Sequence, residues 1–217
     1  MAGNSYDTPP FLTLDHTCRN PGSVLEALNG DWKKFIESDD ELTIRLTVQG
    51  ISDPSDRKSI SWDDATLLWV SICELDKNGR PPTLEISSAK ERMGRFPARQ
   101  SSPYRYLIEN IRPRLDKDGK NEGFDNLLSL LSNLVDGLSS ERVGDERFVK
   151  GSGGLALQGW LSLEDAKELS RLLQSRCWMV SREEPLDGGV NDVAQNLVKL
   201  LKKAIKKRMG VILRSHS

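Results

Sequence analysis

Two different periods of apolar residues run through this chain, and their mixture restricts the fold more than any other feature. In residues 124–138 every third or fourth residue is apolar, which predicts an amphipathic helix with a wide buried face. In residues 42–48 apolar and polar side chains alternate, which is typical of a strand with one buried face. Segments of the two kinds follow each other in no strict order. They therefore predict an α+β fold rather than repeating βαβ units.

These patterns predict a mostly antiparallel sheet with about five helices packed on one face. Residues 67–75 are almost continuously apolar, as expected of a central strand, and Asn78-Gly79 predicts a tight hairpin turn after it. The predicted helices are 23–37, 104–111, 124–138, 163–173 and 190–208, and the predicted strands are 42–48, 67–75, 83–86, 148–149, 155–157, 177–180 and 211–213. Two predicted capping boxes pair Ser23 with Glu26 and Ser162 with Asp165.

The length of the chain, 217 residues, is sufficient for a hydrophobic core and fits one domain. Residues 1–10 are polar and contain a Pro-Pro pair, so we expect a flexible arm there. Residues 11–217 are expected to form a single α+β domain. The charged, glycine-bearing residues 116–123 are the best candidate for a seam between two subdomains.

The cysteines and the hydropathy pattern indicate where a chain of this kind resides. Its three cysteines show no close spacing, and no charged-then-apolar leader precedes a cleavage site, which together favour a reduced, cytoplasmic location. No apolar run approaches the roughly 18–20 residues of a membrane-spanning helix. We therefore expect no integral membrane association.

Metal and nucleophile chemistry find little support in the sequence. The only histidines are His16 and His216, and no cysteine pair has metal-ligand spacing, so neither a metal nor another cofactor is expected. His16 and Cys18 are the only neighbouring base and nucleophile. On a strand they would share a face, but a buried cysteine beside an incidental histidine is the favoured interpretation.

Phosphate-binding and carboxylate sites are also poorly organised. The glycine-rich residues 151–159 lack the lysine of a phosphate-binding loop and its strand-to-helix context, so a hairpin turn is favoured. Glu74 or Asp76 with Glu85 would supply two acids for a metal-dependent nuclease, but no lysine follows on the same face. A hydrolase or nucleotide-processing enzyme remains an alternative only if its carboxylates come from distant parts of the chain.

Basic residues are the most specific signal. The net charge is −1, but residues 1–109 carry −4 and residues 110–217 carry +3. Residues 88–114 carry +5 with interleaved aromatic rings; arginine forks contact phosphates and aromatic rings stack on bases. The candidate binding residues of this segment are Arg92, Arg95, Arg99, Tyr104, Arg105 and Tyr106.

The predicted last helix carries the second group of candidate binding residues, which are Lys199, Lys202, Lys203 and Lys206. Their spacing places all four on one side of the helix, opposite its apolar side. Such a face suits phosphates, an acidic protein or an anionic membrane surface. A purely structural explanation stays open, because lysines near a helix C-terminus also stabilise the helix dipole and keep the surface soluble.

These observations favour a non-enzymatic cytosolic interaction protein that binds a protein partner. The partner would be an enzyme to be regulated, a toxin to be neutralised or a member of a larger assembly. The charge-poor face of helix 124–138 adds support, because a solvated helix normally carries lysine and glutamate there. The alternative is nucleic-acid binding by residues 88–114, helped by the last helix.

Overall fold

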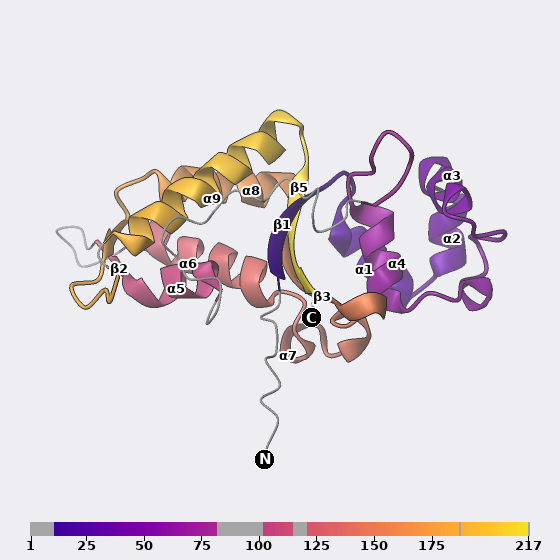
Figure 1. Cartoon of the computed structure of the whole chain (residues 1–217), viewed down its shortest axis with the longest axis horizontal. Helices are drawn as coiled ribbons and strands as arrows, with labels where there is room; N and C mark the ends of the chain where they lie inside the picture. The colour runs from indigo at the N-terminus through magenta and orange to yellow at the C-terminus, as the bar shows by residue number, and fades with distance from the viewer. Residues whose placement is uncertain (1–10, 82–101, 115–120, 187, 217) are drawn as a thin grey trace, which may run out of the picture.

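The computed structural model describes residues 11–81, 102–114, 121–186 and 188–216. Within these residues nine α-helices and five strands form an α+β fold, as predicted (Figure 1). The predicted arm at 1–10, the predicted strand at 83–86 and most of the predicted seam at 116–123 lie outside the described residues.

A three-stranded antiparallel sheet occupies the middle of the molecule. Its strands are β1 (Phe11–Thr17), β5 (Gly210–His216) and β3 (Leu155–Leu161), in the order β1-β5-β3. The C-terminal strand is therefore the central one, and it joins the two ends of the described chain. A second, two-stranded antiparallel sheet pairs β2 (Ile111–Pro113) with β4 (Trp178–Val180).

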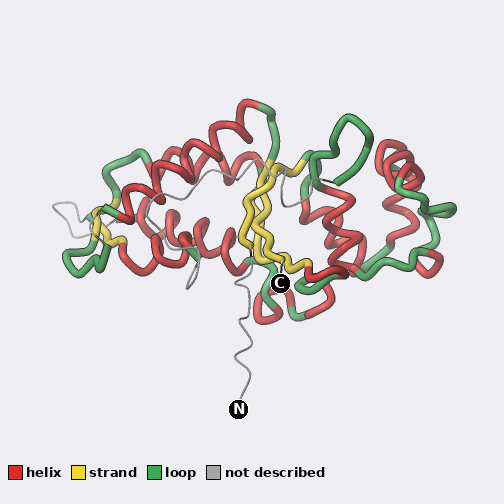
Figure 2. The backbone as a smooth tube through the Cα atoms, viewed as in Figure 1, coloured by secondary structure: helices red, strands yellow, loops and turns green. Residues whose placement is uncertain are grey.

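Helices cover both faces of the three-stranded sheet, rather than the one face that was predicted (Figures 1 and 2). On one face lie α5 (Pro103–Asn110), α6 (Glu122–Asp136), α8 (Leu163–Leu173) and α9 (Gly189–Lys206); on the other lie α1 (Pro21–Asn29), α2 (Trp32–Glu37), α3 (Asp40–Val48) and α4 (Asp64–Ile72). Successive β5 residues show the arrangement, because Val211 and Leu213 join one apolar cluster and Ile212 joins the other.

Shorter helical segments complete the described chain. They are α7 (Ser140–Val143) and the 3-10 helices η1 (Arg57–Ser59), η2 (Glu146–Phe148) and η3 (Ser152–Gly154). The predicted hairpin around residues 148–157 is present as a tight turn, in which the amide of Gly151 donates to the Leu155 carbonyl at 2.8 Å. Only its second half continues as a strand, β3.

Two segments predicted as strands form helices instead: residues 42–48 lie in α3, and residues 67–72 of the predicted strand 67–75 lie in α4. In α3 the alternating apolar residues form two helical stripes, with Leu42 and Leu46 fully buried and Ile44 and Val48 exposed. In α4 nearly every residue is buried, because the helix packs against the sheet, α1 and α3. A short apolar run cannot distinguish a helix buried on all sides from a buried strand.

The predicted helix 23–37 is divided into α1 and α2 at Gly30. The capping box predicted at Ser23 is wrong, because Asn20 caps α1 and its side chain accepts from the amide of Gly22. Asp31 caps α2 in the same way. By contrast, Ser162 and Asp165 form the predicted capping box of α8.

The two sides of α6 differ in burial: the apolar side is covered within the chain, whereas on the charge-poor side Ser129 is exposed and Ser132 and Asn133 are half-buried. α6 packs against β3, α8 and α5, and Leu127, Leu131 and Leu134 are fully buried. Gly159 of β3 lies directly against the last turn of the helix, where a Cβ atom would be 2.5 Å from the Leu134 carbonyl oxygen. The core accounts for the apolar side of α6, and an external partner on its charge-poor side stays a prediction.

A buried ion pair connects the sheet to α4. Arg214 of β5 donates through Nε to Oδ2 of Asp15 in β1 at 2.6 Å, and both side chains are almost completely buried. The guanidinium of Arg214 also lies 4.5 Å from the ring centre of Trp69 in α4. The pair thus fixes the α1–α4 layer to the two strands formed by the ends of the chain.

Candidate functional site

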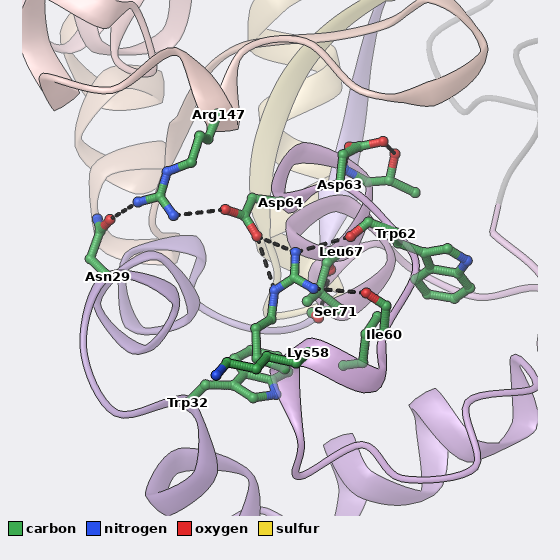
Figure 3. Close-up of polar contacts among 12 residues, drawn as sticks. Asn29, Trp32, Lys58, Ile60, Trp62, Asp63, Asp64, Leu67, Ser71 and Arg147 are labelled. Atoms are coloured by element: carbon green, nitrogen blue, oxygen red, sulfur yellow. Dashed lines mark hydrogen bonds and ion pairs between the residues drawn. The ribbon is translucent and has the colours of Figure 1, made fainter.

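A cluster of polar side chains surrounds the N-terminus of α4 (Figure 3). Asp64 accepts from Arg57 through Oδ1 and from Nη1 of Arg147 through Oδ2, the latter at 3.0 Å. Arg57 also donates to two backbone carbonyls, and Arg147 donates to the side chain of Asn29. Both oxygens of this carboxylate are therefore occupied by the protein's own donors, which is typical of a structural joint.

The neighbouring Asp63 caps α4 and binds a distant loop. It accepts from the amide of Thr66 at 2.7 Å and from the amide and hydroxyl of Ser152 at 2.8 and 2.5 Å. Burial raises the pKa of Asp63, but the hydrogen bonds from Ser152 and Thr66 outweigh this effect and leave the pKa below its usual value.

We expect Asp63→Ala to lower the free energy of unfolding by about 1–2 kcal/mol at pH 7, because it removes a helix cap. A carboxylate with a lowered pKa in the folded protein stabilises it above the unfolded pKa of about 4, and this contribution is lost as the pH falls through the folded-state value. Urea unfolding at several pH values should therefore show the variant and the parent converging below about pH 4.

Asp56→Ala is the matched control, because Asp56 caps only the short η1 and its side chain accepts from the amide of Lys58 within the same turn. Its effect should be smaller than that of Asp63→Ala. A difference between Asp63→Ala and the parent that stayed constant down to the acid limit would contradict the role given to the carboxylate.

The neighbouring base and nucleophile of the sequence have separate partners. His16 Nδ1 lies 3.2 Å from Oε2 of Glu74, which also accepts from Lys207 at 2.8 Å. Burial raises the pKa of Glu74, but Lys207 and His16 outweigh it and hold the pKa below its usual range. The thiol of Cys18 instead donates to the carbonyl of Ile72 at 3.3 Å. The structure thus shows no interaction between the imidazole and the thiol.

The described carboxylates considered for a nuclease, Glu74 and Asp76, accept hydrogen bonds from the protein's own groups. Asp76 accepts from the amides of Asn78 and Arg80 and so organises the turn. Glu85 lies outside the described residues. In the described part of the chain no group of three or more His, Cys, Asp or Glu side chains is placed to hold a metal ion.

The described candidate residues between 88 and 114, which are Tyr104, Arg105 and Tyr106, do not form one exposed surface. Arg92, Arg95 and Arg99 lie outside the described residues. Tyr104 and Tyr106 are 3% and 7% exposed and belong to the core, so neither ring is available to stack on a base. Burial raises the pKa of both tyrosines. Arg105 is exposed and forms an ion pair with Asp136 of α6.

Tyr106 has a structural function at the start of α9. Its hydroxyl donates to Oε1 of Glu184 at 3.2 Å and accepts from the amide of Leu186 at 3.1 Å. The same Glu184 oxygen accepts from the amide of Val190 at 2.6 Å, in the first turn of α9. This hydrogen-bonded group therefore fixes the N-terminus of the helix that carries the lysines.

The predicted lysines of α9 are all exposed and lie on one side of the helix. We name Lys199, Lys202, Lys203 and Lys206 the lysine face. The opposite side of α9 is buried and contributes seven apolar residues to the core, which are Val190, Val193, Ala194, Leu197, Leu200, Leu201 and Ala204. Residues 193–217 contain no aspartate or glutamate.

The lysine face lies far from Arg112 and Arg114, two of the described basic residues of the 88–114 segment. Arg112 and Arg114 are exposed beside β2, at one end of the molecule, whereas the lysine-bearing end of α9 reaches the three-stranded sheet (Figure 1). The two groups therefore do not converge into one patch in the described structure.

Similarity to other proteins does not extend this description. Comparison with protein-family models, curated proteins and solved structures finds no match in any of the three. None of the described helices combines the length and the apolar character needed to cross a membrane. The case for function therefore rests on the exposed surface.

One exposed feature was not predicted from the sequence. Ile44 and Val48, one helical turn apart on α3, are 64% and 62% exposed. The strand prediction placed them on the same face as Leu42 and Leu46, which are buried. The acidic run that ends at Glu41 is the signal that could have revealed them, because Asp39 caps the helix and acids favour a first helical turn.

Proposed function

We propose that this protein is a binding protein whose lysine face docks an acidic surface of a protein partner. One observation carries the proposal: four exposed lysines cover one side of α9, in a stretch of 25 residues without an acidic side chain. A surface of one charge sign attracts an oppositely charged partner and raises the rate of association. The rigid helix below it holds the four charges in fixed relation.

Two observations favour a protein partner over a nucleic acid. The tyrosines that would stack on bases are core residues. In addition, residues 11–76 contain 13 acidic and six basic side chains, and this negative layer would repel an extended phosphate backbone. A compact acidic patch on a protein can contact α9 alone.

The test compares capture of partners by two variants of equal charge change. In the first, Lys199, Lys202, Lys203 and Lys206 are replaced by glutamine; in the control, the exposed Lys33, Lys34, Lys58 and Lys77 are replaced. Tagged proteins are incubated with nuclease-treated lysate of the source organism, and the bound proteins are quantified by mass spectrometry. We expect the first variant to lose its partner by at least about tenfold and the control to retain it.

Two results would contradict the proposal. If both variants captured the partner equally, the lysine face would not take part in the interaction. Binding that appears only without nuclease treatment would identify a nucleic acid as the partner instead. Circular dichroism melting curves of both variants serve as the folding control, because all the substituted side chains are exposed.

A further inference from the structure

The outer side of α3 is an unusual surface for a core-packed helix. Ile44 and Val48 are more exposed than Met179, at 44%, or Leu186, at 37%, the other exposed large apolar residues of the described chain. We name Ile44 and Val48 the α3 face. Because Leu42 and Leu46 on the opposite side already anchor the helix, the α3 face adds nothing to the core. Adjacent exposed apolar side chains of this kind are characteristic of contact surfaces.

Acidic residues border the α3 face at its N-terminal end. Asp40 and Glu41 lie one turn before Ile44, and both are exposed. Glu41 has one cation nearby, Arg19 at 3.8 Å, but that guanidinium is held at 2.9 Å by Asp39. The α3 face therefore combines an apolar centre with an acidic rim at its N-terminal end, whereas at the other end Val48 borders the turn that contains Gly79.

The lysine face has the complementary chemistry. Lysine stems are apolar chains of four methylene groups that can lie on an apolar surface while the ammonium groups remain in water or reach carboxylates. Lys202 and Lys206 are four residues apart on α9, the same spacing as Ile44 and Val48 on α3. Residues 193–206 carry four basic side chains and no acidic one, opposite in sign to the layer that holds α3.

These two faces cannot meet within one molecule. α3 and α9 lie on opposite sides of the three-stranded sheet (Figure 1). Building on the proposed function, we propose that the lysine face of one copy of this chain docks on the α3 face of a second copy. Because the two surfaces differ, the contact is head-to-tail. An assembly of docked copies therefore has an unoccupied lysine face at one end and an unoccupied α3 face at the other.

The experiment uses two variants that each destroy one face. Ile44→Ser/Val48→Ser removes the α3 face, and Lys202→Gln/Lys206→Gln weakens the lysine face; all four side chains are exposed, so both variants should fold. Sedimentation velocity at low ionic strength should show concentration-dependent oligomers for the parent protein and monomers for each variant alone. An equimolar mixture of the two variants should form a heterodimer that grows no further, because only one intact pair of faces remains.

Salt provides an independent arm of the test. Raising the ionic strength shortens the range of the attraction between the acidic rim and the lysines, so the parent oligomers should dissociate. If the Ile44→Ser/Val48→Ser variant formed oligomers to the same extent as the parent protein, the inference would be overturned. A mixture of variants that stays monomeric would also overturn it, because the intact lysine face of one variant would then not bind the intact α3 face of the other.

The remaining outcome separates this inference from the proposed function. A parent protein that stays monomeric at every concentration overturns self-docking. If the lysine-face variant nevertheless loses a captured partner, the proposed function stands and the partner is a different acidic protein.

Discussion

Replacing Gly159 with alanine is expected to lower the free energy of unfolding by about 3 kcal/mol. The new Cβ atom would collide with the carbonyl oxygen of Asn133 and lie 2.5 Å from that of Leu134. Both are backbone atoms in the last turn of α6. That turn cannot withdraw, because the amide of Leu138 also donates to the Gln158 carbonyl at 2.8 Å.

The measurement is urea unfolding followed by tryptophan fluorescence. Gly123→Ala is the matched control, because Gly123 lies in the first turn of the same helix and its nearest contact would be the side chain of Cys177 at 3.3 Å. Alanine there also gains helix propensity. We expect the control to stay within about 1 kcal/mol of the parent. A Gly159→Ala variant as stable as the control would show that β3 and α6 are not tightly apposed.

Replacing Arg214 with methionine is expected to lower the free energy of unfolding by about 3–5 kcal/mol at pH 7, the largest effect we predict. The change leaves the Asp15 carboxylate buried between the sheet and α4 without its ion-pair partner at 2.6 Å. It also removes the cation from the ring of Trp69. Desolvation of the remaining charge, rather than loss of attraction alone, dominates the cost.

A double-mutant cycle distinguishes these contributions. Arg214→Met combined with Asp15→Leu removes both charges and should recover much of the lost stability. Arg171→Met is the matched control, because Arg171 forms an exposed ion pair with Glu168 at 2.7 Å. We expect that control to change stability by less than about 1 kcal/mol. An Arg214→Met variant that behaved like the control would disprove a buried charge at this position.

Local patterns in the sequence were sufficient for the elements whose signals agree with one another. The helix period of residues 124–138, the capping box at Ser162 and the long amphipathic segment that ends in lysines all correspond to observed helices. The lysine face follows directly from that last pattern, since spacing alone decides which residues share a side of a helix. Part of the candidate site could therefore be predicted without a structure.

The misassigned segments carried signals that conflict. In α3 the period-two pattern of apolar residues outweighed the acidic N-cap at Asp39, so the exposure of Ile44 and Val48 was missed. In α4 the apolar run resembled a buried strand, although Asp63 marks a helix start. A helix cap contributes only about 1 kcal/mol. Its sequence signal is therefore weak beside the apolar periodicity of the residues that follow it.

The sequence by itself determined the α+β class and the lysine-rich side of the last helix, because each depends on residues near one another in the chain. Only the tertiary structure decided that the two ends of the described chain pair at the centre of the sheet and that helices cover both its faces. It also decided that Tyr104 and Tyr106 are core residues while Ile44 and Val48 are exposed. Burial depends on contacts between segments that are distant in sequence, such as Asp15 with Arg214, and no local pattern encodes them.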